Sequence, residues 1–314
     1  MLVGVLNHSS VQINVSAIQF VNNEIPISEI VPQNIDLTYA VADVFFGIAI
    51  AELVICLFIL WFYIVYRNNS HIRKSSFPIS VAILIGIIIG CIGQITYSLG
   101  ATDALCIITL YFYRTGLIIV LSGMLVKNYR IYRIFANKTA SAINLSEVKL
   151  LSIMIAIAAA YLLLLTVVVT VLGFNAELMY NANNVFYQYV ECRVPNSTWN
   201  TIFTIIMGAI SAVIIIFFIA FAWLTRNVSS DYRETKALSA FVVVVTGTYL
   251  ILVTLIYSFK DSTDSQLFRY ILSAELVAII NTCTILFLFF PKIYSIIKQT
   301  RKRKHRESAR RVSQ

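Results

Sequence analysis

Three ionisable side chains lie inside long apolar stretches of the chain: Glu52, Arg114 and Glu275. A charge in such surroundings is costly, so it is usually paired and marks an ion path, a binding pocket or a structural contact. Counted from the start of their own stretches, these residues lie at similar depths of about eight to ten helical residues. We therefore expect Arg114 to pair with Glu275, and with Glu52 as second choice. Such a pair could be purely structural, or could belong to an activation relay or a small-molecule pocket.

The stretches that carry these charges are long enough to cross a lipid bilayer. The chain has 314 residues, of which 59% are hydrophobic and 12% charged. Crossing the hydrocarbon takes roughly 20 apolar residues, and a span must be helical because lipid offers no partner to the backbone. The sequence predicts an all-α membrane protein, a seven-transmembrane helix bundle. Its expected spans are 42–66, 78–100, 105–127, 150–173, 199–225, 237–258 and 267–290.

The distribution of Lys and Arg predicts the orientation of these spans. The first 66 residues contain no Lys or Arg, although the net charge is +9. With the N-terminus outside and the C-terminus inside, 20 of the 24 basic residues fall on the cytoplasmic side, which is the known bias of membrane proteins. KNYRIYRIF at 127–135 then marks the point where the third helix meets the anionic inner leaflet. Because basic residues are spread between apolar runs, no nucleic-acid partner is expected.

Two of the five cysteines fall on the predicted outer side. Cys106 begins the third span and Cys192 precedes the fifth, and the extracellular side is oxidising. We expect a disulfide between them. Asn7, Asn14 and Asn196 begin outer-side glycosylation sequons, although equal matches on the inner side show how little this pattern proves alone.

A series of short motifs gives the chain a family resemblance. In chain order they are IRKSSFP at 72–78, Cys106 with Gly116 and Lys127 at fixed spacings, KNYRIYRIF at 127–135, Cys192, TRNVSSDYRETK at 225–236 and PKIY at 291–294. Together they resemble class C heptahelical G-protein-coupled receptors over about 70–296, and within them the metabotropic GABA-B-like branch. The resemblance implies a multi-pass receptor of the plasma membrane without a cofactor or metal.

The termini are interpreted in the light of this resemblance. Residues 1–40 are expected to form an extracellular leader, either floppy and polar or the remnant of the clamshell ligand-binding domain of such receptors. Alternating apolar residues from Val11 to Ala17 are typical of a strand. The bundle is expected over 41–296, and 297–314 forms a basic cytoplasmic tail. The lack of a cysteine-rich connector before the bundle favours the GABA-B-like branch over the glutamate branch.

The resemblance also implies roles for residues at the inner end. Lys127 and Glu234 would form an ion pair that holds the resting state, and Arg130, Arg133 and Lys236 would face a heterotrimeric G protein. The alternative is that these charges only obey membrane topology. The family further implies a homodimer or a heterodimer with another class C subunit.

Other classes of function fit less well. A transporter or channel is the main alternative, since buried charges suit it, but the two halves show no repeat and no matching broken helices. An enzyme is not expected, because there is no glycine-rich phosphate loop and the three histidines are far apart. Gly86, Gly90 and Gly93 form a small-residue face on the second span, which we expect to pack inside the bundle.

Overall fold

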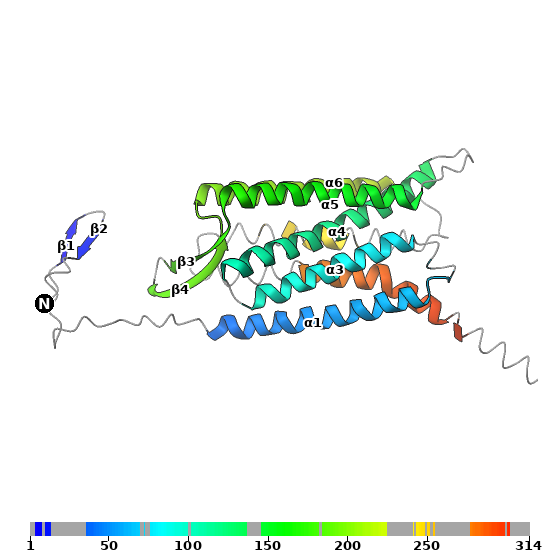
Figure 1. Ribbon diagram of the computed structural model, residues 1–314, viewed down its shortest axis with the longest axis horizontal. Coiled ribbons are helices and arrows are strands. Elements are labelled where there is room, and N and C mark those ends of the chain that lie inside the picture. The colour runs from blue at the N-terminus through cyan, green and yellow to red at the C-terminus, as the bar shows by residue number, and fades with distance from the viewer. Residues whose placement is uncertain are drawn as a thin grey trace, which may run out of the picture.

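The computed structural model describes residues 4–7, 10–13, 36–69, 72, 76–99, 102–136, 146–181, 184–224, 241, 243–248, 250, 251, 254, 277–298, 300 and 301. Five long helices are α1 (Asp36–Val65), α3 (Phe77–Ser98), α4 (Asp103–Ala136), α5 (Glu147–Leu172) and α6 (Ser197–Leu224). We call Val277–Lys298 the last helix. Figure 1 shows the helices side by side along the long axis of the molecule, with α3 and α4 between α1 and the α5–α6 pair.

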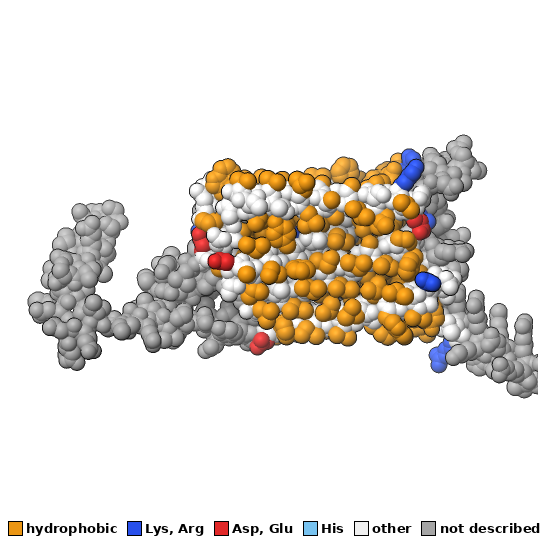
Figure 2. All heavy atoms as spheres, in the orientation of Figure 1, with side chains coloured by type: hydrophobic (Ala, Val, Ile, Leu, Met, Phe, Trp, Pro, Cys, Tyr) orange, Lys and Arg blue, Asp and Glu red, His pale blue; other side chains and the backbone are white. Residues whose placement is uncertain are grey.

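Six helices of the described part of the chain are long and apolar enough to cross a membrane. Five of them coincide with predicted spans, and the sixth, Val277–Lys298, overlaps the predicted span 267–290 in part. The remaining span, 237–258, is helical at the positions that the structure describes within it. Figure 2 shows hydrophobic side chains covering the helices on the face in view, which is the surface that lipid requires. The chain is therefore an all-α membrane protein of the seven-helix type.

Two helices run well past the C-terminal ends of their predicted spans. α4 has 34 residues, which corresponds to about 51 Å and exceeds the hydrocarbon thickness of about 30 Å. KNYRIYRIF is thus a helical continuation of the span. The last helix continues through Pro291 to Lys298, whereas the apolar run ends near 290, and a π-helical turn at Ile285–Phe289 precedes this proline.

Close approach of α3 and α4 forms the centre of the bundle. A Cβ atom placed on Gly116 of α4 would lie 2.5 Å from the backbone nitrogen of Gly90, and one on Gly93 of α3 would lie 2.6 Å from that of Tyr113. A Cβ atom placed on Gly86 would collide with the side chain of Ile119. The glycine face of α3 therefore packs inside the bundle, as the sequence predicts.

A β-hairpin connects α5 to α6. Its strands, β3 (Asn175–Asn181) and β4 (Asn184–Arg193), are antiparallel, with Ala176 opposite Cys192. Gly173 lies between α5 and the hairpin at φ 71°, a conformation that only glycine adopts readily. A second antiparallel pair, β1 (Gly4–Asn7) and β2 (Ser10–Ile13), lies near the N-terminus, so part of the expected alternating segment is a strand.

Candidate functional site

The C-terminal end of α4 carries the first group of predicted site residues. Lys127 is only 5% exposed, and its ammonium donates a 2.7 Å hydrogen bond to the hydroxyl of Ser80 on α3. A buried ammonium needs such partners because its desolvation is costly. The predicted partner Glu234 lies outside the described residues, so the Lys127–Glu234 pair stays a prediction. Ser80 was not singled out in the sequence. The signal that could have pointed to it was a serine just after Pro78, at the start of the second predicted span.

The next two turns of α4 carry two further basic residues, Arg130 and Arg133. The Arg130 guanidinium lies 4.0 Å from the carboxylate of Glu147 at the start of α5. Arg133 lies over the ring of Tyr129, 6.0 Å from its centre, and the Tyr129 ring in turn meets Phe221 of α6 edge-on. The C-terminal end of α4 is thus connected to both α5 and α6. Lys236, the third residue expected to face a G protein, lies outside the described residues.

A second group of polar residues surrounds Glu52 in the membrane interior. Glu52 of α1 is 5% exposed, and its carboxylate accepts hydrogen bonds from Thr282 and, at 3.5 Å, from the amide nitrogen of Asn281, both on the last helix. The thiol of Cys91 on α3 lies 3.8 Å from the same carboxylate. Three helices therefore meet at one carboxyl group. The signal for Asn281 and Thr282 was a polar pair within an apolar stretch.

Arg114 lies elsewhere in the bundle. Its guanidinium lies beside the hydroxyl of Tyr161 on α5. Within the described part of the chain, Arg114 and Glu52 do not form an ion pair, because each has neutral partners on different helices. Glu275, the first-choice partner, lies outside the described residues, so this pairing stays a prediction.

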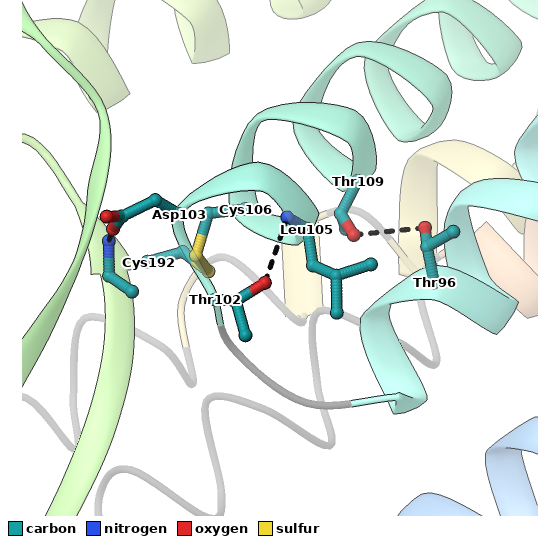
Figure 3. Close-up of a disulfide and its surroundings, with 8 residues drawn as sticks. Thr96, Thr102, Asp103, Leu105, Cys106, Thr109 and Cys192 are labelled. Carbon is teal, nitrogen blue, oxygen red and sulfur yellow. Dashed lines mark hydrogen bonds between the residues drawn. A yellow bond between two sulfur atoms is a disulfide. The ribbon is translucent and has the colours of Figure 1, made fainter.

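The N-terminal end of α4 is linked to the β3–β4 hairpin. Cys106 and Cys192 form a disulfide across 86 residues of sequence, and Asp103 accepts a 2.8 Å hydrogen bond from the backbone nitrogen of Ala176. Figure 3 shows both links between the first turn of α4 and the hairpin. Because Ala176 and Cys192 are opposite each other in the hairpin, they form one anchoring point. An ion pair of 2.7 Å between Arg193 and Glu177 also joins the two strands.

Asn196 lies directly before α6. It is exposed, and its side-chain oxygen accepts hydrogen bonds from the backbone nitrogens of Thr198 at 3.0 Å and Trp199 at 3.3 Å. It therefore caps the helix N-terminus. Asn14 lies outside the described residues, as does the side chain of Asn7. Glycosylation at the three sequons stays a prediction. Of the described residues, no group of three His, Cys, Asp or Glu could hold a metal ion.

Comparison with known proteins identifies the family. The family described as "7 transmembrane sweet-taste receptor of 3 GCPR" matches residues 35–292. The chain therefore belongs to this family, the seven-helix domain of class C G-protein-coupled receptors, which are signalling receptors and not enzymes.

Relatives in Dictyostelium discoideum agree with this assignment. Metabotropic glutamate receptor-like protein C is 25% identical over 235 residues, covering 74% of this chain and 28% of that protein. Metabotropic glutamate receptor-like protein B is 24% identical over 247 residues, covering 78% of this chain and 32% of that protein. The chain thus spans less than a third of the length of these two relatives.

Proposed function

We propose that the chain is the signal-transducing part of a class C receptor of the plasma membrane, and that it passes an extracellular signal to a heterotrimeric G protein. The observation that carries this proposal is the construction of α4. Its first turn is linked to the hairpin by the Cys106–Cys192 disulfide, and its last turns carry Lys127, which is buried, and the half-buried Arg130 and Arg133. One rigid element therefore reaches from the cystine end of the bundle to its basic end.

The charge distribution supports an outside N-terminus. Figure 2 shows acidic side chains at the hairpin end of the helices, whereas basic side chains gather at the opposite end. Lys and Arg prefer the cytoplasmic side of a membrane, and disulfides form on the oxidising side. Both preferences give the same orientation.

Finer assignments follow from the motifs. IRKSSFP at 72–78 resembles the first inner loop of the GABA-B-like branch and favours that branch. We further propose that the chain acts as a homodimer or as a heterodimer with another class C subunit, as the resemblance implies.

Nucleotide exchange on purified G proteins tests this function. The full chain is reconstituted in liposomes, and binding of a fluorescent GTP analogue to Gα is measured for each major Gα class with Gβγ present. Exchange faster than with empty liposomes, for at least one class, is the expected result. If no Gα class responds while the same liposomes conduct ions, the chain is a channel or transporter and the proposal is wrong.

Orientation is tested separately on intact cells. Single cysteines placed near the two ends of the chain are treated with a membrane-impermeant maleimide. Labelling near the N-terminus alone is expected. Labelling of the basic C-terminal tail alone would reverse the proposed topology and with it the side on which a G protein could bind.

A further inference from the structure

The last helix contains one turn that is wider than an α-helical turn. The turn spans Ile285–Phe289 and is closed by a hydrogen bond from the Phe290 backbone nitrogen to the Ile285 carbonyl. Asn281, Ile285 and Phe289 are 3%, 6% and 0% exposed, so buried positions recur here every four residues. An α-helix repeats every 3.6 residues, and a π-helical turn adds the missing fraction. The wide turn therefore keeps these three side chains on one face.

Pro291 explains why the wide turn occurs at this position. A proline has no backbone N–H, and its ring clashes with the carbonyl four residues earlier, here that of Phe287. Helices in membranes relieve this clash by local π-helical adjustments. Replacing Pro291 by a residue with an N–H would remove the clash and favour an ordinary α-helical turn.

Helix α1 contacts the last helix on both sides of this adjustment. Before the turn, Glu52 accepts hydrogen bonds from Asn281 and Thr282. At its inner end, the ring of Tyr63 meets that of Phe289 edge-on, with 5.4 Å between ring centres. We call these the outer clamp and the inner clamp.

The geometry of the two helices makes the clamps depend on the wide turn. Glu52 and Tyr63 are eleven residues apart, about three α-helical turns, so they lie on one face of α1. Asn281 and Phe289 are eight residues apart, and in an uninterrupted α-helix they would point about 80° away from each other. Both clamps can therefore close only while the wide turn persists.

We propose that the wide turn is a conformational switch, held by the two clamps of α1. In its second state the turn is α-helical, and the segment from Phe289 to Lys298 is rotated by nearly one residue position relative to Asn281. The outer clamp persists, because Glu52 would otherwise lose two hydrogen-bond partners in an apolar interior. The inner clamp opens, and the inner end of the last helix turns against α1.

Such a switch has two discrete arrangements, which is what a signalling bundle requires. The rotating segment ends at the same end of the molecule as the last turns of α4 (Figure 1). Its effect on signalling rests on the proposed function. The rotation itself does not, and it can be measured without a ligand or a G protein.

Cysteine reactivity reports the rotation directly. Ile296 is 1% exposed, whereas its neighbour Ile297 is 53% exposed. Single cysteines at these two positions are introduced into the full chain in liposomes, with Cys283 replaced by alanine, and labelled with a small permeant maleimide. In the native background, Ile297→Cys is expected to react faster than Ile296→Cys. With Pro291→Ala added, Ile296 takes the place of Ile297, and the Ile296→Cys rate rises to the level of Ile297→Cys.

Removing the outer clamp distinguishes a rotation of the last helix from a general loss of packing in the bundle. In the Pro291→Ala background, Glu52→Leu leaves the inner clamp as the stronger contact, so Ile296→Cys is expected to become slow again. The matched variant Glu52→Gln keeps an acceptor oxygen, and Ile296→Cys should stay fast. The buried thiols of Cys56 and Cys91, quantified on separate peptides, must remain unlabelled if the bundle is folded.

A second variant leaves the last helix unchanged. Tyr63→Leu opens the inner clamp while Pro291 is retained, and it is expected to raise the reactivity of Ile296→Cys. Phe62→Leu is the control, since Phe62 stacks on Tyr66 of its own helix. Unchanged labelling of Ile296→Cys in both Pro291→Ala and Tyr63→Leu would overturn the switch. If the labelling of Ile296→Cys changes as expected but no G protein responds, the switch stands and only the proposed function is refuted.

Discussion

The ammonium of Lys127 and the hydroxyl of Ser80 lie 2.7 Å apart and join the C-terminal part of α4 to the start of α3. Both residues are buried, so the side chain of Lys127 is turned into the bundle and not towards the lipid surface. A partly desolvated charge contributes more to a contact between helices than an exposed one does. This position therefore suits a residue that holds one state of the bundle.

Lys127→Ala is expected to raise ligand-free signalling, because it removes the buried charge that restrains the inner end. The measurement is GTP-analogue binding to the responsive Gα in liposomes. Lys149→Ala is the control, since this lysine is exposed at the start of α5. Equal basal exchange in the native chain and in Lys127→Ala would exclude a restraining role.

Ser80→Ala is expected to destabilise the bundle by about 1–3 kcal/mol, because Lys127 loses a hydrogen-bond acceptor in a buried environment. Thermal unfolding in detergent measures the loss. Ser152→Ala makes the same chemical change at an exposed serine that bonds only to its own helix, and should leave the midpoint almost unchanged. A comparable shift in both variants would contradict a special role for Ser80.

Gly116→Ala is expected to cost about 1–3 kcal/mol of stability, because the added methyl group meets the backbone of Gly90 and forces α3 and α4 apart. Gly47→Ala is the matched control on α1, where an added Cβ has no atom within 4 Å. The two variants are compared by thermal unfolding and by the monodisperse fraction after purification. An unaffected Gly116→Ala protein would show that the two helices can separate without cost.

Breaking the disulfide is expected to cost about 2–4 kcal/mol, because the bond closes a long loop. Cys106→Ser, Cys192→Ser and the double variant should lose the same stability, since all three remove one bond. Cys283→Ser, which alters a free thiol, is the control. Additive losses in the double variant would mean that the cysteines contribute separately.

Asn196 allows capping and glycosylation to be distinguished. Asn196→Ala is expected to cost about 1 kcal/mol through the lost helix cap, whereas Asn196→Asp keeps an acceptor oxygen and should preserve stability. Both variants remove the sequon. A glycosidase-sensitive mobility shift that disappears in both would establish a glycan, while equal stability of the two would argue against the cap.

The spans could be predicted from the sequence because lipid selects long apolar stretches whatever their tertiary partners. The pairing of Cys106 with Cys192 could also be predicted, because the order of the spans places both cysteines on the same side of the membrane. The β3–β4 hairpin was missed, because its anchoring depends on Asp103, 73 residues away from Ala176.

The polar contacts inside the bundle were harder to predict. Depth along the helices suggested Glu275 as the partner of Arg114, with Glu52 as second choice, but depth does not say which way each helix face turns. In the structure Arg114 contacts Tyr161, and Glu52 contacts the last helix. The partners that the structure describes for both charges are neutral, and a neutral partner has a weaker sequence signal than an opposite charge. The wide turn before Pro291 was likewise not foreseen.

The glycine contacts between α3 and α4 have a consequence for how the domain can change shape. Backbones that touch at Gly90 and Gly116, and again at Gly93 and Tyr113, cannot slide past each other without collision. α3 and α4 are therefore fixed relative to each other, and a conformational change of the domain must move the other helices around this pair. Resting and active forms of this domain should accordingly be superimposed on α3 and α4, so that the displacement of every other helix is measured from a fixed frame.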